Sequence, residues 1–399
     1  MGVRETTKNA KIAKVRLGDV CQVVSGATPK TSVKEYWDGE FAWVTPAELK
    51  GEVVVTTTER KLTKAGLDSC SLKLIPQGAV LLTSRAPIGK VAIAGCDMYC
   101  NQGFKNLVCS ETVHNLYLYY WLKSNGEYLY SLGRGATFKE ISKTIVENIK
   151  IPLPSLLEQK RIAEELDQIC ELKKNAEERL ALMDELVKSR FVEMFGDPVQ
   201  NNRGWPLAHL QELATKIGSG ATPKGGKSSY AESGVSFIRS MNVHDARFKY
   251  DDLAYLTDSQ AKELSNVEVR SLDVLLNITG ASVARSCVVP DDVMPARVNQ
   301  HVAIIRPVQD KLDSCFLNAM FISGPYKRLL LNLGDSNGAT RQAITKGQIE
   351  NLALPLPPIG EQRKFAAFVA EVDKSKFAVR KRLEKARLLY RAKLQEYFG

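Results

Sequence analysis

The segment GATFKEISKTIVENIKIPLPSLLEQKRIA at residues 135–163 decides the fold, because the chain contains it twice. Its counterpart, GATRQAITKGQIENLALPLPPIGEQRKFA at residues 338–366, aligns with it without a gap. The same shift in register continues to the end of the second copy, where EMFG at residues 193–196 becomes EYFG at residues 396–399. A repeat of this length indicates that one structural unit has been duplicated.

The duplication extends towards the start of each copy. The hexapeptide SGATPK occurs at Ser25–Lys30 and again at Ser219–Lys224. Further on, VLLTSRAPIGKVAI at residues 80–93 corresponds to VLLNITGASVARSCVV at residues 274–289. Both segments predict a buried strand, a turn of small residues that carries a cation, and a second strand. Each copy is therefore a globular segment followed by a long helix.

A long periodic segment begins after each proline-rich IPLP or LPLP strand, which those prolines should end. Apolar residues recur at steps of three and four, which places them on one stripe of a helix and predicts a coiled-coil seam. The range Glu158–Phe195 predicts a helix about 57 Å long, and Glu361–Phe398 is its counterpart. Ser155 and Glu158 predict a capping box, but Pro358 stands at the equivalent position of the second copy. The predicted helix-pairing residues are Ile162, Leu166, Ile169, Leu180, Met183, Val187, Phe365, Val369, Val372, Val379, Leu383 and Tyr390.

The two helical segments carry opposite charge, with a net −3 over residues 151–196 and a net +6 over residues 355–399. Opposite charge favours pairing between them. Antiparallel pairing would relate the two copies by a pseudo-twofold axis. In the alternative, each helix packs only on its own globular domain. A seam of this length requires an equally long partner, which favours pairing.

Length and composition are those of a soluble protein. The 399 residues are 44% hydrophobic and 25% charged, which indicates two or three globular domains. No apolar run approaches the roughly 18 residues that span a bilayer, and the polar N-terminal segment lacks the apolar core of a signal peptide. The eight cysteines are scattered and contain no C-x-x-C pair. These features predict a cytoplasmic protein with reduced cysteines and no membrane partner.

The sequence contains no convincing catalytic motif. The four histidines lie far apart, and neither a phosphate-binding G-x-x-x-x-G-K-[ST] loop nor a G-x-G-x-x-G helix start is present. Adjacent carboxylates at Asp251–Asp252 and Asp291–Asp292 are more typical of solvated turns than of a metal site. We therefore expect a non-catalytic binding protein without a metal ion.

The net charge of +10 favours a polyanionic partner. Lysine and arginine neutralise DNA phosphates, whereas arginine, asparagine and glutamine read base edges. The framework recurs in both copies while the contents of the loops differ, as two different readings by one scaffold would require. Taken singly, each loop cation is better explained as a solvated surface charge. As a group, the candidate DNA-binding residues are Lys30, Arg85, Lys90, Lys105, Arg134, Lys139, Lys224, Arg239, Arg285, Arg297, Arg341 and Lys346.

Two further repeated motifs allow two interpretations. The threonine and lysine of SGATPK could contact a phosphate, and the pairs Asn101–Gln102 and Asn299–Gln300 could read adenine. Their identity in two otherwise divergent copies favours a role in the shared framework instead.

In combination, the duplicated SGATPK, the G-A-T…I-P-L-P-x-x-E-Q segment and the two long helices resemble the specificity subunit of type I restriction-modification enzymes. The resemblance covers the whole chain. It implies an α+β fold with two target-recognition domains, at residues 1–154 and 197–357, and two long antiparallel coiled-coil helices, at residues 155–196 and 358–399. In that family each domain reads one half of a bipartite DNA sequence, and the helices fix the unread gap. One departure is Ala284, which stands where the first copy has Gly89.

The resemblance also implies the partners. These are double-stranded DNA, two methyltransferase (modification) subunits that dock on the helices, and restriction subunits. S-adenosylmethionine, ATP and Mg are expected on those subunits and not in this chain. The residues leave one alternative open, a scaffold that binds proteins without touching DNA, because residues 197–354 carry a net charge of only +1. A stand-alone nuclease would require a carboxylate–metal cluster that the sequence does not show.

Overall fold

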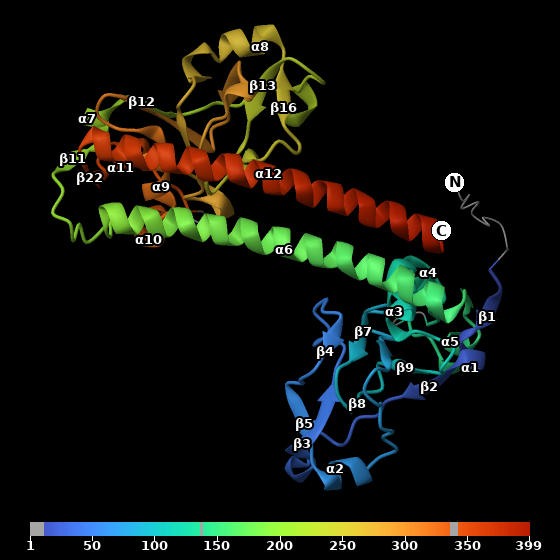
Figure 1. The fold of residues 1–399 in the computed structure, drawn as a ribbon. Coiled ribbons are helices and arrows are strands. Elements are labelled where there is room, and N and C mark those ends of the chain that lie inside the picture. The colour runs from blue at the N-terminus through green and yellow to red at the C-terminus, as the bar shows by residue number, and fades with distance from the viewer. Residues whose placement is uncertain (1–11, 136–138, 336–341) are drawn as a thin grey trace, which may run out of the picture. The chain divides into compact units, whose positions relative to one another are not determined.

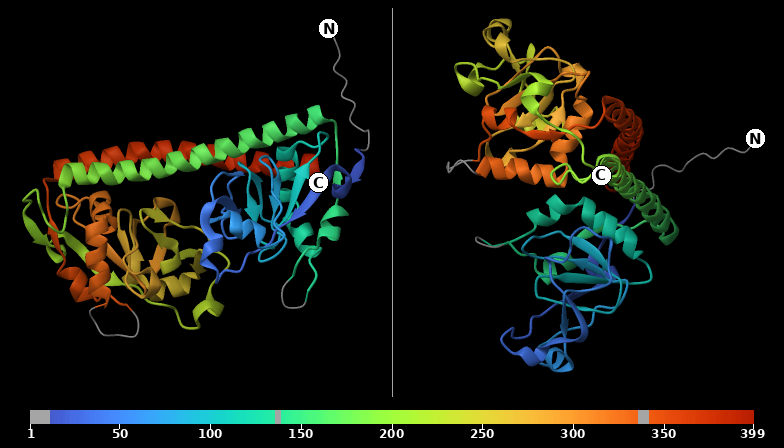
Figure 2. Two further views of the ribbon diagram at one scale, coloured as in Figure 1. Left: turned by 90° about the horizontal axis from the view of Figure 1, so that it is seen from below. Right: turned by 90° about the vertical axis from the view of Figure 1, so that its left-hand side faces the viewer.

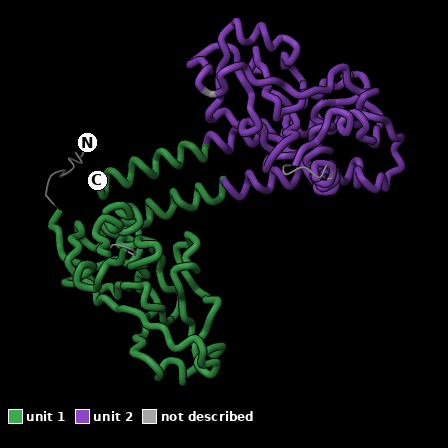
Figure 3. The backbone as a smooth tube through the Cα atoms, turned by 180° about the vertical axis from the view of Figure 1, so that it is seen from behind, with its two compact units in different colours: residues 1–176, 382–399 green, residues 177–381 purple. Residues whose placement is uncertain are grey.

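The structure is a computed structural model that describes residues 12–135, 139–335 and 342–399. The chain forms two compact units (Figure 3). Unit 1 consists of residues 1–176 and 382–399, and unit 2 of residues 177–381. Each long helix therefore starts in one unit and ends in the other.

Unit 1 is built on two main sheets (Figure 1). The first has the strand order β2-β9-β6-β7-β4 and the second the order β5-β3-β8, while β1 pairs with β10. The strands are β1 (Lys14–Arg16), β2 (Cys21–Ser25), β3 (Trp37–Val44), β4 (Val54–Val55), β5 (Arg60–Leu62), β6 (Val80–Leu82), β7 (Val91–Ala94), β8 (Tyr99–Cys100), β9 (Lys105–Cys109) and β10 (Lys150–Pro152). The short helices are α1 (Leu17–Val20), η1 (Lys34–Tyr36), α2 (Lys64–Asp68), α3 (Asn115–Ser124), α4 (Gly126–Ser131) and α5 (Lys143–Glu147).

Unit 2 repeats this plan. Its sheets have the orders β12-β21-β18-β19 and β16-β13-β20-β17, with the pairs β11-β22 and β14-β15. The strands are β11 (Leu207–His209), β12 (Ala214–Ser219), β13 (Val235–Ile238), β14 (Val243–His244), β15 (Arg247–Phe248), β16 (Ala254–Leu256), β17 (Glu268–Val269), β18 (Val274–Asn277), β19 (Ser286–Val288), β20 (Ala296–Val298), β21 (Val302–Pro307) and β22 (Ala353–Pro355). The short helices are α7 (Leu210–Leu213), η2 (Gly226–Ser229), η3 (Ser240–Asn242), α8 (Asp258–Glu263), η4 (Ser265–Val267), η5 (Gly280–Ser282), η6 (Asp291–Val293), α9 (Ser314–Ile322), α10 (Gly324–Asp335) and α11 (Lys346–Glu350).

Corresponding strands pair in the same way in both units. The hairpin β6–β7 is antiparallel, as is β18–β19, which agrees with the strand–turn–strand prediction for residues 80–93 and 274–289. The contacts β3–β8 and β13–β20 are parallel in both units. The repeat is thus one of chain path as well as of sequence.

The central strands have apolar side chains on both faces. In β6, Val80 and Leu82 belong to the core beneath the helices, whereas Leu81 belongs to the core shared with the second sheet. In β18 the alternation is the same, with Leu275 on the side away from the helices. Because successive side chains point to opposite faces, a run such as VLL marks a strand that is covered on both sides.

Each long helix has 40 residues, α6 (Leu156–Phe195) and α12 (Ile359–Phe398). Both begin two residues earlier than we predicted. The capping-box prediction was only half right. The Ser155 hydroxyl accepts a hydrogen bond from the Glu158 N–H at 3.3 Å, but the Glu158 carboxylate pairs with Arg161 at 2.7 Å and so leaves the box open.

Within unit 1, the start of α6 lies against the end of α12. The Glu165 carboxylate accepts a hydrogen bond from the Tyr397 hydroxyl at 2.5 Å and forms an ion pair with Lys393 at 2.9 Å. These two contacts hold the pKa of Glu165 below its ordinary value. The apolar core of unit 1 includes Ile162 of α6, and Tyr390 of α12 packs against it. The start of α6 therefore packs on its own domain and on the other helix together.

Within unit 2, the end of α6 lies against the start of α12 (Figure 2). The ring centroids of Phe191 and Phe365 are 5.6 Å apart. Further along, Lys376 forms an ion pair with Asp184 at 2.7 Å. Because higher numbers in α6 meet lower numbers in α12 in both units, the pairing is antiparallel, as predicted. All twelve predicted helix-pairing residues are buried or half-buried.

The aromatic contact in unit 2 leads to a stability prediction. Phe191 is 2% exposed and also packs on Phe195 and Phe316, so Phe191→Ala should lower the free energy of unfolding by about 3–5 kcal/mol. The neighbouring Val192 is 56% exposed, and Val192→Ala should change it by less than about 0.5 kcal/mol. Urea titration of the full chain measures both values, and equal losses would contradict the assignment of the seam.

Candidate nucleic-acid interface

In both units, the SGATPK segment lies against the repeated Asn–Gln pair. The Thr28 hydroxyl donates a hydrogen bond to Gln102, and the Thr222 hydroxyl donates one to Gln300. The main chain follows the same pattern, since the Ala27 N–H bonds to the Cys100 carbonyl at 3.0 Å. Two motifs that are far apart in sequence therefore form one joint in each unit.

The glycine of SGATPK is required by a close approach of two backbones. A Cβ atom on Gly26 would collide with the carbonyl oxygens of Cys100 and Asn101, and one on Gly220 would collide with that of Val298. The Asn101 side chain is also used inside the joint, where its Oδ1 accepts the Gly103 N–H at 2.9 Å. These contacts agree with the framework interpretation of both motifs.

A second set of backbone hydrogen bonds places the loop tips in register. In unit 1 the Ser84 N–H bonds to the Gly103 carbonyl at 2.7 Å, and the Ile141 N–H bonds to the Ser84 carbonyl at 3.0 Å. In unit 2, Ile278 takes the place of Ser84. Its N–H bonds to the His301 carbonyl at 3.0 Å, and the Ile344 N–H bonds to the Ile278 carbonyl at 2.8 Å. The residues that follow, Arg85 and Thr279, therefore occupy equivalent positions.

The strand that parallels each Asn–Gln segment supplies a second equivalent pair. The Asn101 N–H bonds to the Val44 carbonyl at 3.2 Å, and the Asn299 N–H bonds to the Ile238 carbonyl at 3.0 Å. The next residues are Thr45 in unit 1 and Arg239 in unit 2. The two units thus carry a threonine and an arginine at the same two positions, but in exchanged order.

The predicted cations of unit 1 gather around Glu140. Its carboxylate lies 3.8 Å from the Arg85 guanidinium and 3.3 Å from the ammonium of Lys105. Lys105 is only 7% exposed in β9, so its position does not support its predicted contact with DNA. The backbone of Arg134 pairs with that of Glu140. Lys139 precedes Glu140 and places its ammonium 4.5 Å from the ring centroid of Tyr130. One carboxylate thus holds a cluster that remains positive overall.

A cavity lies beside this cluster. It encloses about 480 Å³. The Lys90 ammonium donates to the Pro46 carbonyl at 3.0 Å next to it. Lys30 is exposed, on the loop that continues from SGATPK. The cavity-lining residues are Thr45, Pro46, Ala47, Arg85, Ala86, Asn101 and Gly103.

The predicted cations of unit 2 are used differently. The Arg239 guanidinium donates to the Asp252 carbonyl and lies 5.7 Å from the Tyr230 ring centroid. Lys346 forms an ion pair with Glu350 at 3.4 Å within α11. Lys224 is exposed and Arg285 half-buried, whereas Arg341 lies outside the described residues.

The position of Arg297 does not support its predicted contact with DNA. The residue is 8% exposed in β20, and its guanidinium donates to the carbonyls of Ala261 at 3.1 Å and Ala296 at 2.9 Å. The Glu268 carboxylate lies 3.8 Å away. A buried cation held by internal acceptors is part of the interior, which favours a structural role.

Sequence reasoning missed His301. Its Nδ1 lies 2.6 Å from the Thr279 hydroxyl, at the place where unit 1 has Gly103 and Arg85. The signal was present in the sequence, because His301 directly follows the repeated Asn299–Gln300 pair. The same framework therefore presents an arginine–carboxylate cluster in unit 1 and a threonine–histidine pair in unit 2.

The buried thiols have the character of core residues. Burial raises the pKa of Cys100 and of Cys287 to about 12, so both stay protonated and unreactive at neutral pH. Among the described residues, no group of three or more potential ligands is placed to hold a metal ion. No helix in the described ranges is long and apolar enough to cross a membrane.

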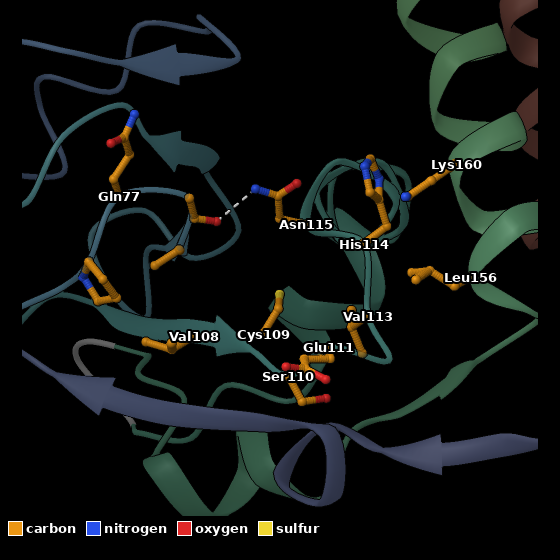
Figure 4. A pocket seen from close by; sticks show the side chains of 13 residues that line it. Gln77, Val108, Cys109, Ser110, Glu111, Val113, His114, Asn115, Leu156 and Lys160 are labelled. Carbon is orange, nitrogen blue, oxygen red and sulfur yellow. Dashed lines mark hydrogen bonds between the residues drawn. The ribbon is translucent and has the colours of Figure 1, made fainter.

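A second cavity of unit 1, of about 320 Å³, lies between the loop before α3 and the first turns of α6 (Figure 4). His114, Leu156 and Lys160 line its helical side. Burial, with a contribution from Lys160, lowers the pKa of His114. The Asn115 amide donates across the cavity wall to the Gly78 carbonyl at 2.9 Å.

The family of the chain follows from its two halves. A model described as the type I restriction modification DNA specificity domain matches residues 9–182 and matches again at residues 202–387. The chain belongs to this family.

Relatives in the specificity-domain family span most of its length. The type I restriction enzyme MjaIX specificity subunit of Methanocaldococcus jannaschii is 28% identical over 379 residues, which are 89% of this chain and 85% of that protein. The S subunit of the type I system from M. genitalium has a TM-score of 0.63 at 14% identity, over 99% of this chain and 98% of that one. A chain solved in work on complex assembly and conformational transition of the type I R-M system has a TM-score of 0.57 at 23% identity, over 97% of each chain. The two structural likenesses concern the fold.

The close approach at the joint can be tested with two glycines of unit 1. Gly26→Ala should cost about 1–3 kcal/mol of unfolding free energy, because its new methyl group meets backbone that cannot move away freely. In α4, a Cβ on Gly126 would meet no atom within 4 Å, so Gly126→Ala should be neutral or stabilising by up to about 1 kcal/mol. Similar losses for the two variants in urea titration would show that the joint is loose.

Proposed function

We propose that this chain is the DNA sequence-recognition subunit of a type I restriction-modification complex. Each globular domain reads one half of a bipartite target, and α6 and α12 fix the unread gap between the halves. The observation that carries the proposal is that one backbone framework presents different side chains in the two units. Arg239 of unit 2 stands at the position of Thr45, and Thr279 stands at the position of Arg85. Membership of the specificity family supports the proposal. In this function the chain is the specificity component and not the catalytic one.

The partners follow from the same proposal. Two methyltransferase (modification) subunits dock on the paired helices, and restriction subunits join that complex. S-adenosylmethionine is bound by the modification subunits, and ATP with Mg is used by the restriction subunits. Exposed apolar side chains along α6 and α12, such as Leu172, Leu182 and Phe377, offer surface for helical partners.

The scaffold alternative predicts a different response to salt. A reader that neutralises phosphates loses affinity steeply as salt rises, because DNA binding releases condensed counterions. Filter binding of duplex DNA to this chain with its modification subunits, between low and physiological salt, separates the two functions. A flat dependence would favour a protein scaffold that does not contact DNA.

The two exchanged arginines should affect different half-sites. Arg85→Ala should relax discrimination in one half of the target, and Arg239→Ala in the other, each by about 1–3 kcal/mol per base read. The two variants control for each other, because the untouched domain reports on general damage. Methylation of duplexes that carry every single-base change in each half-site measures the effect. Losses spread evenly over both halves would mean that these arginines bind phosphates or stabilise the fold.

A further inference from the structure

Gln159 and Gln362 are polar side chains with 0% exposure in the first turns of α6 and α12. Both belong to the repeated Glu–Gln of the IPLP segment. Neither can reach a DNA molecule, and neither belongs to the seam between the helices. Their burial in both copies therefore requires an explanation other than base reading or helix pairing.

In unit 1, every donor of the Gln159 amide has a backbone partner. Its Oε1 accepts the His114 N–H at 2.9 Å. Its Nε2 donates to the carbonyls of Thr112 at 3.0 Å and Pro154 at 2.9 Å. One side chain thus joins the helix to the loop before α3 and to the segment that follows β10.

In unit 2, Gln362 makes the same three contacts. Its Oε1 accepts the Asp313 N–H at 2.9 Å, and its Nε2 donates to the carbonyls of Lys311 at 3.2 Å and Pro357 at 2.8 Å. The side chains of these partners differ from those in unit 1, with lysine for threonine and aspartate for histidine. The contact is kept because it uses only the backbone.

Such a contact fixes the orientation of the helix on its domain, which apolar packing alone leaves adjustable. Burial of Ile162 and Leu166 holds α6 on its domain, but hydrophobic contact is non-directional. A buried amide with all its hydrogen bonds made permits one geometry, because a rotation would leave buried groups unpaired. A cavity lined by His114, Leu156 and Lys160 lies on the same side of the joint (Figure 4).

We propose that Gln159 and Gln362 are positioning residues that fix the angle between each long helix and its own recognition domain. They thereby restrict the complex to one length of unread gap between the half-sites. The inference rests on the proposed function, since a gap has meaning only for a bipartite reader. It assigns gap selectivity to the joints at the helix starts as well as to the length of the helices.

The test uses Gln159→Met and Gln362→Met, which nearly conserve volume and remove the hydrogen bonds. Each full-length variant is assembled with the modification subunits. Methyl transfer is then measured on duplexes whose gap has the natural length, one base pair fewer or one more. The ratio of the rate at the altered gaps to the rate at the natural gap should rise about tenfold in each variant, the factor that corresponds to loss of a firm hydrogen-bonded constraint.

Ile162→Val provides the matched control, because it trims a buried side chain one turn along α6 without touching the three hydrogen bonds. It should lower stability and leave the gap ratio unchanged. If Gln159→Met does not fold, Gln159→Glu keeps an acceptor for the His114 N–H and serves for the same comparison. An unchanged ratio in the folded glutamine variants, or an equal rise in Ile162→Val, would overturn the inference. A wild-type complex without any bipartite preference would instead refute the proposed function.

Discussion

The antiparallel contact between α6 and α12 is the constraint on which the rest of the structure depends. Most of the stability of a helix with one apolar stripe comes from the packing of that stripe and not from its intrinsic helix propensity. In each unit it is covered by the other helix and by the sheet core together. Apolar contact alone would allow the helices to slide, whereas the charged contacts of Glu165 with Lys393 and of Asp184 with Lys376 favour one register. In each unit, apolar packing therefore holds the two helices against the domain core, and the ion pairs set their register.

On this base, the two units keep one framework and vary what it presents. The joint between SGATPK and the Asn–Gln pair is made of backbone hydrogen bonds and a glycine contact, so it tolerates few changes. The positions next to it carry side chains that can change without loss of the fold. An arginine beside Glu140 in unit 1 is replaced by Thr279 with His301 in unit 2. This division between a fixed backbone and free tips is what a pair of different readers requires.

Much of the fold could be predicted from the sequence, because the repeat and the helical stripe are periodic signals. The antiparallel pairing and the strand–turn–strand hairpins agree with those predictions. Individual DNA-binding residues were harder to predict, because the sequence around a lysine or arginine does not show whether its side chain faces solvent or the interior. Arg297 looked like an exposed cation, yet it lies in a strand with internal acceptors. The role of Gln159 was also hidden, since its partners are backbone atoms that no side-chain pattern marks. The contacts of the proposed DNA-binding residues remain predictions.

The central claim is that one chain carries two different DNA readers. Sequencing of methylated bases in the host genome tests it most directly, with the gene present and with the gene deleted. The account predicts an adenine-methylated motif with two unlike halves and a constant gap, which disappears on deletion. A methylation pattern that is the same with and without the gene would contradict it.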